Sequence, residues 1–133
     1  MKARHQFCLA AGLCDTLTGL LLVVAPLFTL RLMMIPGEVA QPVLIRFIGA
    51  FVFGIGSAYL RPFLDADPAR REQRFAGMLD VTAGARLAVG SFVTVAVLTG
   101  ALHPMWATVA VTDLGLAAVQ IVLLKRGVFA RGP

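Results

Sequence analysis

Apolar residues gather into four long blocks, which short connectors rich in charge, Pro or Gly keep apart. The blocks run from about Phe7 to Leu30, Val43 to Leu60, Phe75 to Leu98 and Met105 to Leu124. Each block reaches the roughly 17 to 25 residues with which a helix crosses the hydrocarbon core, and all are too long for core strands. The pattern predicts an all-α fold, an integral membrane four-helix bundle, with residues 1–133 as a single transmembrane domain.

The composition agrees with this expectation. Hydrophobic residues make up 59% of the 133 residues and charged residues only 14%, whereas about a quarter of a soluble domain is charged. The net charge of +5 lies beside the ends of the blocks and is not interleaved with aromatic residues, so nucleic acid is not an expected partner. The expected surroundings are the lipid bilayer.

The orientation follows from the basic residues, because short connectors rich in Lys and Arg stay on the cytoplasmic side. On the other side of the predicted membrane, the two connectors contain only Arg31. The basic residues of the remaining segments are Lys2, Arg4, Arg61, Arg70, Arg71, Arg74, Lys125, Arg126 and Arg131. The bias predicts a multi-pass protein with both termini in the cytoplasm.

Residues that commonly hold metals or cofactors do not form a recognisable set. Cys8 and Cys14 are six positions apart in one helix, which is neither a redox pair nor a metal-binding spacing. His5 and His103 are predicted at opposite membrane faces. Gly54-Ile55-Gly56 is a fragment of a glycine-rich loop inside a membrane helix, where no phosphate site forms. We therefore predict no metal and no cofactor.

Five charged residues interrupt the blocks: Asp15, Arg46, Asp80, Arg86 and Asp113. A charge at the bilayer centre costs about 2.5 to 3.5 kcal/mol even on an insertion scale, so such groups face the protein interior and find partners. At about 1.5 Å of rise per residue, Arg86 and Asp113 both lie about eleven residues from the inner face, and we predict that they pair. Asp15 lies about eight residues deep and Asp80 about five. Arg46, about three residues from the outer end, can also extend to water.

Small and polar residues follow the charges at helical spacing in every block, and we expect these four stripes to form the interior of the bundle. Their members are Cys8, Ala11, Gly12, Asp15, Thr18 and Gly19; Arg46, Gly49, Ala50, Phe53, Gly56 and Ser57; Gly77, Asp80, Gly84, Leu87 and Ser91; and Trp106, Ala110, Asp113, Ala117 and Gln120.

A short internal sequence similarity links the first and third blocks. Asp15-Thr-Leu-Thr-Gly19 is similar to Asp80-Val-Thr-Ala-Gly84, and both blocks are predicted to run outward. This similarity suggests a duplicated helical hairpin, with the two copies related by an axis along the membrane normal.

One further pattern resembles a known group of proteins. Arg46-Phe-Ile-Gly49 is followed by Gly54 and Gly56, then by Arg86 in the third block and Asp113 in the fourth. Over the second to fourth blocks, this resembles the small bacterial four-helix membrane proteins of the DoxX-like kind. The resemblance implies a four-helix fold in the bacterial inner membrane, and association of some members with quinone-linked oxidation complexes.

Three classes of function are consistent with the buried charges. Three acids against two arginines leave one carboxylate over, and a carboxylate in an apolar site can exchange a proton with a substrate. The favoured hypothesis is binding of, or acid-base chemistry on, a lipophilic small molecule (isoprenoid, sterol-like or quinone). Asp15 and Asp80 are then the candidate proton donors or acceptors, and the structural or binding residues are Arg46, Arg86, Asp113 and Gln120.

The other two classes are a small proton-coupled transporter and an accessory subunit of a larger membrane complex, in which further copies of the chain are also candidate partners. Arg86 and Asp113 can equally serve only to join two helices. Small dual-topology transporters need a weak charge bias, whereas the bias of this chain is strong.

Overall fold

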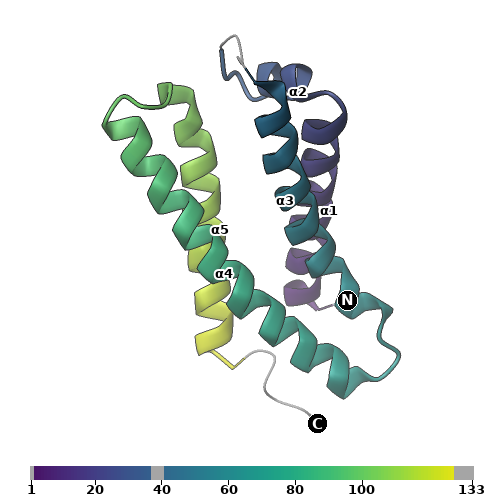
Figure 1. The fold of residues 1–133 in the computed structure, drawn as a ribbon. Coiled ribbons are helices and arrows are strands. Elements are labelled where there is room, and N and C mark those ends of the chain that lie inside the picture. Colours follow the sequence, from purple (N-terminus) through teal and green to yellow (C-terminus); the bar gives the residue numbers. More distant parts are fainter. Residues whose placement is uncertain (1, 37–40, 128–133) are drawn as a thin grey trace. The chain divides into compact units, whose positions relative to one another are not determined.

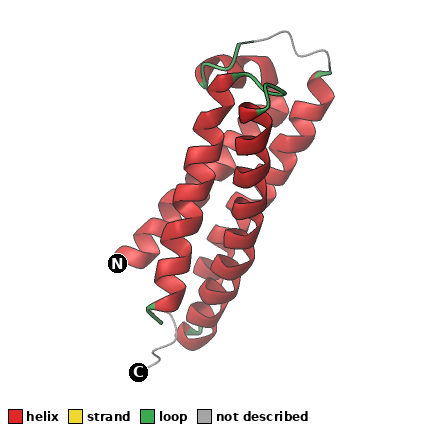
Figure 2. Cartoon of the chain, turned by 90° about the vertical axis from the view of Figure 1, so that its left-hand side faces the viewer, coloured by secondary structure: helices red, strands yellow, loops and turns green. Residues whose placement is uncertain are grey.

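The computed structural model describes residues 2–36 and 41–127, which form helices joined by loops (Figures 1 and 2). Four helical stretches in this part of the chain are long and apolar enough to cross a membrane, which indicates a multi-pass membrane protein and confirms the all-α class. The elements are α1 (Ala3–Val24), α2 (Pro26–Leu32), α3 (Pro42–Leu60), the 3-10 helix η1 (Arg61–Leu64), α4 (Pro68–Leu98), the 3-10 helix η2 (Pro104–Trp106) and α5 (Ala107–Lys125).

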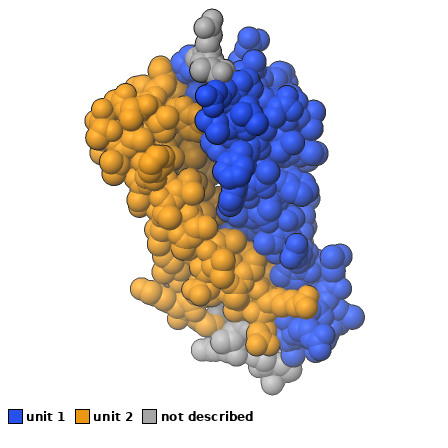
Figure 3. All heavy atoms as spheres, in the orientation of Figure 1, with its two compact units in different colours: residues 1–71 blue, residues 72–133 orange. Residues whose placement is uncertain are grey.

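The chain divides into two compact units (Figure 3). Unit 1 comprises residues 1–71 and contains α1, α2 and α3; unit 2 comprises residues 72–133 and contains α5 with all but the first residues of α4. Each unit is therefore built on a helical hairpin. That residues 1–133 act as one domain stays a prediction.

The first predicted helix is not continuous, and the expectation of one helix from residue 7 to residue 30 is wrong. α1 ends at Val24, Ala25 leaves the helical conformation (φ −134°, ψ 64°), and Pro26 begins α2. Proline lacks the N–H that would bond to the carbonyl of Leu22, and its ring obstructs the preceding turn. Proline at the first position of a helix is tolerated, so Pro26 ends one helix and starts the next.

Arg46 of α3 stabilises this break. Its Nη1 donates a hydrogen bond of 2.9 Å to the carbonyl oxygen of Val23, one of the last carbonyls of α1. The final carbonyls of a helix lack partners within the helix, and a cationic side chain there also interacts favourably with the helix dipole. The guanidinium, although exposed, thus has a specific structural role in unit 1.

The third predicted helix begins earlier than expected. α4 starts at Pro68, seven residues before the apolar block, so the connector that carries Arg70 and Arg74 is helical. Asp67 caps this start, because its Oδ1 accepts a hydrogen bond of 3.0 Å from the Ala69 amide and its carbonyl accepts one from the Arg71 amide. A capping acid followed by proline is a strong helix start, which hydropathy alone does not register.

Close glycine contacts join α1 and α3 in unit 1. Gly12 and Gly19 on α1 lie seven positions apart, as do Gly49 and Gly56 on α3, so each pair lies along one face of its helix. A Cβ atom added to Gly49 would lie 2.9 Å from the carbonyl oxygen of Gly19, and one added to Gly12 would lie 2.8 Å from the Cβ of Tyr59. The two backbones approach too closely for any larger side chain, as is common between membrane helices.

Candidate functional site

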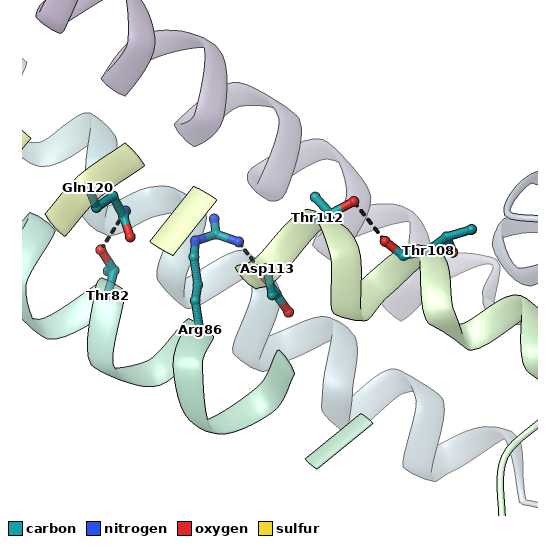
Figure 4. A network of polar contacts seen from close by, with 6 residues as sticks. All are labelled: Thr82, Arg86, Thr108, Thr112, Asp113 and Gln120. Carbon is teal, nitrogen blue, oxygen red and sulfur yellow. Dashed lines mark hydrogen bonds and ion pairs between the residues drawn. The ribbon is translucent and has the colours of Figure 1, made fainter. Parts of the chain in front are cut away.

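The candidate site is the seam between α4 and α5 in unit 2, whose centre is an ion pair (Figure 4). Arg86 Nη1 lies 2.5 Å from Asp113 Oδ1, so the predicted pair is confirmed. The Arg86 side chain is 5% exposed and that of Asp113 is 16% exposed. Within the described residues, the Asp113 carboxylate receives this one bond at Oδ1 and none at Oδ2. A buried cation thus lies beside a carboxylate that retains an open acceptor.

A second polar contact lies one helical turn away on the same seam. Gln120 Nε2 donates a hydrogen bond of 3.1 Å to Thr82 Oγ1, and that hydroxyl donates 2.8 Å to the carbonyl oxygen of Met78. Thr82 and Gln120 are both buried. Because Thr82 precedes Arg86 by four residues, the two contacts lie on one face of α4.

Small residues bring the two helices of this seam together. Ala83 on α4, with Ala110 and Ala117 on α5, are buried. Gly90 accommodates the Leu114 side chain, since a Cβ added there would lie 2.7 Å from Leu114 Cγ. Gly90 thus faces a side chain, whereas the glycines between α1 and α3 largely face backbone atoms.

Asp80 is not on this seam, and the expected interior stripe of the third helix is wrong. All five residues of that stripe are exposed in the structure: Gly77, Asp80, Gly84, Leu87 and Ser91. The buried face of α4 instead contains Phe75, Leu79, Thr82, Ala83, Arg86, Gly90, Val93 and Ala96. Six residues separate Asp80 from Arg86, which places them about 120° apart around a helix, so one stripe cannot bury both.

Asp15, the other candidate acid, belongs to α1 in unit 1 and is half-buried. Its backbone packs against α3, because a Cβ added to Gly56 would lie 2.8 Å from the Asp15 carbonyl carbon. The similar segments that begin at Asp15 and Asp80 therefore differ in environment: Gly19 is buried and Gly84 is exposed. Duplication of the hairpin stays a prediction.

The remaining stripes are largely as expected. On α1, the small residues Cys8, Ala11, Gly12 and Gly19 are buried. On α5, the buried members are Ala110, Ala117 and Gln120. On α3, Gly49 and Gly56 are buried, but Arg46, Ala50 and Phe53 are exposed. The buried face of α3 is thus narrower than predicted.

Thr82 was not among the predicted site residues. The available signal was the position of Thr82 one helical turn before Arg86, together with that of Gln120 about two turns beyond Asp113. The described residues contain no group of three or more His, Cys, Asp or Glu side chains placed to hold a metal ion. The chemistry of the seam is that of a guanidinium, a carboxylate, an amide and a hydroxyl.

Comparisons of the chain with protein-family models, with curated proteins and with solved structures found no match.

Proposed function

We propose that this chain is a multi-pass membrane protein that binds a lipophilic small molecule (isoprenoid, sterol-like or quinone, the last as its quinol) through a ligand hydroxyl at the α4–α5 seam. The observation that carries the proposal is the Asp113 carboxylate, whose Oδ1 pairs with the buried Arg86 and whose Oδ2 has no bond within the described residues. Oδ2 would accept a hydrogen bond from a ligand hydroxyl, and the guanidinium orients the carboxylate.

The depth of the pair supports a lipophilic ligand over a water-soluble one. Arg86 and Asp113 lie within helices long and apolar enough to span a membrane. Charged residues at such positions are costly and commonly mark ligand or ion pathways. Val89 and Val111, near the pair in sequence, are exposed apolar side chains of the kind that an alkyl or isoprenoid chain contacts.

The binding proposal is tested by photolabelling the purified protein with diazirine analogues of an isoprenoid alcohol, a sterol and a quinol, one at a time. Asp113→Asn keeps the shape of the side chain but weakens the acceptor, and should reduce labelling by the recognised analogue about tenfold, since a hydrogen bond to a charged group contributes about 1.5 to 3 kcal/mol. Thr112→Val, an adjacent exposed position on α5, is the matched control. Equal labelling of both variants and the unmodified protein by every analogue would refute binding at the seam.

Acid-base chemistry by Asp15 or Asp80 is a separate proposal, because Asp80 lies off the α4–α5 seam and Asp15 belongs to unit 1. Asn preserves the shape of Asp but does not exchange a proton, so Asp15→Asn and Asp80→Asn should retain photolabelling at the seam and lose turnover of a lipophilic substrate. Unchanged turnover in the double variant would leave a binding protein without chemistry at these acids.

An accessory subunit of a larger membrane complex is the second candidate function. It is favoured by the exposed face of α4, where a Cβ added to Gly77 or Gly84 would meet open space and where Asp80 is exposed. Glycines at such spacing permit close approach of another membrane helix. Co-purification of a stoichiometric partner, or of a second copy, from native membranes would support this function; recovery of the chain alone would count against it.

The membrane and its orientation are also part of the proposal. We propose a four-helix bundle in the bacterial inner membrane with both termini in the cytoplasm, supported by the basic residues near residues 2–4, 61–74 and 125–126 and by the DoxX-like resemblance at Arg46, Arg86 and Asp113. Single cysteines at Ala66 and Ala101, introduced after Cys8 and Cys14 are replaced by Ala, should react with impermeant reagents from opposite sides. Labelling of both from one side would refute this topology.

A further inference from the structure

The basic residues of unit 1 fall into two groups, those with a bond inside the chain and those without one. Arg46 bonds to the Val23 carbonyl, and Arg71 donates through Nε (3.1 Å) and Nη2 (2.7 Å) to the carbonyl oxygen of Asp65. By contrast, the exposed side chains of Lys2, Arg31, Arg61 and Arg70 make no hydrogen bond or ion pair within the described residues. Arg31 lies in α2, and the other three, Lys2, Arg61 and Arg70, are the basic set.

The basic set lies at one end of unit 1. Lys2 precedes the first residue of α1, and Arg61 follows the last residue of α3. The rings of His5 and Phe63 meet edge to face with centroids 6.4 Å apart, which holds the start of α1 beside η1. Figure 1 shows the N-terminus of α1 and the segment after α3 at the same end of this hairpin.

Arg70 is fixed at the same end by the turn that leads into α4. The two bonds from Arg71 to the Asp65 carbonyl and the cap formed by Asp67 hold residues 65–71 in one conformation. Arg71 is half-buried and engaged in this turn, whereas Arg70, its neighbour, is exposed. The backbone of this turn is therefore held by bonds of Arg71 and Asp67, and the Arg70 side chain takes no part in them.

An apolar side chain lies among these charges. Leu64, the last residue of η1, is 86% exposed, the largest exposed fraction among the large hydrophobic side chains of the described residues. It lies between Arg61 and Arg70 in sequence, at the end of a helical stretch that is apolar enough to span a membrane. Basic side chains beside an exposed apolar one match the boundary between lipid headgroups and acyl chains.

We infer that this end of unit 1 binds anionic phospholipid, with Lys2, Arg61 and Arg70 contacting the headgroup phosphates and Leu64 inserted among the first acyl carbons. The inference rests on the proposed membrane location and is independent of the ligand proposed for the α4–α5 seam. Charge complementarity identifies the partner, since anionic headgroups attract juxtamembrane basic segments and phosphates accept charge-assisted hydrogen bonds.

The test compares how strongly the full chain in nanodiscs immobilises spin-labelled phosphatidylglycerol and spin-labelled phosphatidylcholine. Both leaflets of a nanodisc have the same composition, so an inverted orientation of the protein would not alter the result. The unmodified protein should immobilise phosphatidylglycerol preferentially, and moderate salt should reduce the preference. Each substitution among Lys2→Gln, Arg61→Gln and Arg70→Gln should weaken the preference about fivefold. Arg31→Gln, in α2 at the other end of unit 1, is the matched control.

Three outcomes would overturn the inference: no preference in the unmodified protein, equal loss in Arg31→Gln, or displacement of phosphatidylglycerol by inorganic phosphate beyond that caused by sodium chloride at the same ionic strength. The last outcome would identify a free-phosphate site. The double variant Arg61→Lys, Arg70→Lys should retain the preference, whereas a folding defect would be visible as lost helicity in circular dichroism.

Discussion

The two helical hairpins of this chain use different interactions to hold helices together in lipid. In unit 1, α1 and α3 meet through Gly12, Gly19, Gly49 and Gly56, and the atoms in closest approach are largely backbone. In unit 2, α4 and α5 are joined by side chains, through the Arg86–Asp113 pair and the Thr82–Gln120 hydrogen bond. One hairpin depends on shape and the other on polar bonds.

The difference matters because apolar side chains gain little from leaving lipid for protein. Association of membrane helices then relies on close packing or on interhelical polar bonds. A glycine seam leaves little room for a ligand, since its backbones are in contact. A polar seam contains groups that a ligand can also bind, which is the reason for placing the proposed site in unit 2.

The largest expected effect comes from breaking the ion pair of unit 2. Arg86→Ala and Asp113→Ala should each lower the free energy of unfolding by about 3 to 5 kcal/mol, because each leaves a buried charge without its partner. The double variant should lose clearly less than the sum of the two. Reversible denaturation in mixed micelles measures all three, and strictly additive losses would show that the pair is not an energetic unit.

A smaller but still large effect is expected from filling the glycine seam of unit 1. Gly49→Ala places a methyl group 2.6 Å from the Leu22 Cβ, and overpacking of this kind costs about 1 to 3 kcal/mol. Gly54→Ala, on the same helix, meets open space and should cost nothing measurable. The same denaturation assay measures the free energy of unfolding of both variants. Equal stability of Gly49→Ala and Gly54→Ala would contradict the close approach of α1 and α3.

The smallest effect is expected at the neutral polar contact of unit 2. Thr82→Val and Gln120→Leu should show a coupling free energy of about 0.6 kcal/mol in a double-variant cycle, the average found for hydrogen bonds between membrane helices. Coupling as large as that of Arg86 with Asp113 would mean that the seam acts as one network. Zero coupling would restrict the stabilising interaction to the ion pair.

Sequence patterns predicted the four long apolar helical stretches and the central ion pair, because the length of an apolar block and the depth of a charge within it both follow from residue counts. Arg86 and Asp113 have opposite charge at equal depth, and depth follows directly from residue counts. The rotation of a helix about its own axis is harder to predict. The stripe through Asp80 was chosen for its small residues, but the buried face of α4 is the one that contains Arg86.

The structural contact of Arg46 was beyond sequence reasoning for a different reason. Hydropathy treats residues 7–30 as one apolar stretch, whereas Pro26 divides it and leaves backbone carbonyls without their usual partners. Only the position of α3 beside this break reveals that Arg46 reaches the Val23 carbonyl. A proline within an apolar block is therefore a reason to look for a polar side chain at the same depth in the next block.

The bond between Arg46 and Val23 also sets an order of events during biosynthesis. Arg46 is added to the growing chain 23 residues after Val23. At about 5 to 20 residues per second, the ribosome needs roughly one to five seconds to cover that distance. Until then, the α1–α2 bend has only local bonds, such as that of 2.8 Å from the Thr29 hydroxyl to the Ala25 carbonyl oxygen. The long-range bond that joins the bend to α3 can form only after residue 46 has been added, so the bend is complete only when both helices of the first hairpin are present.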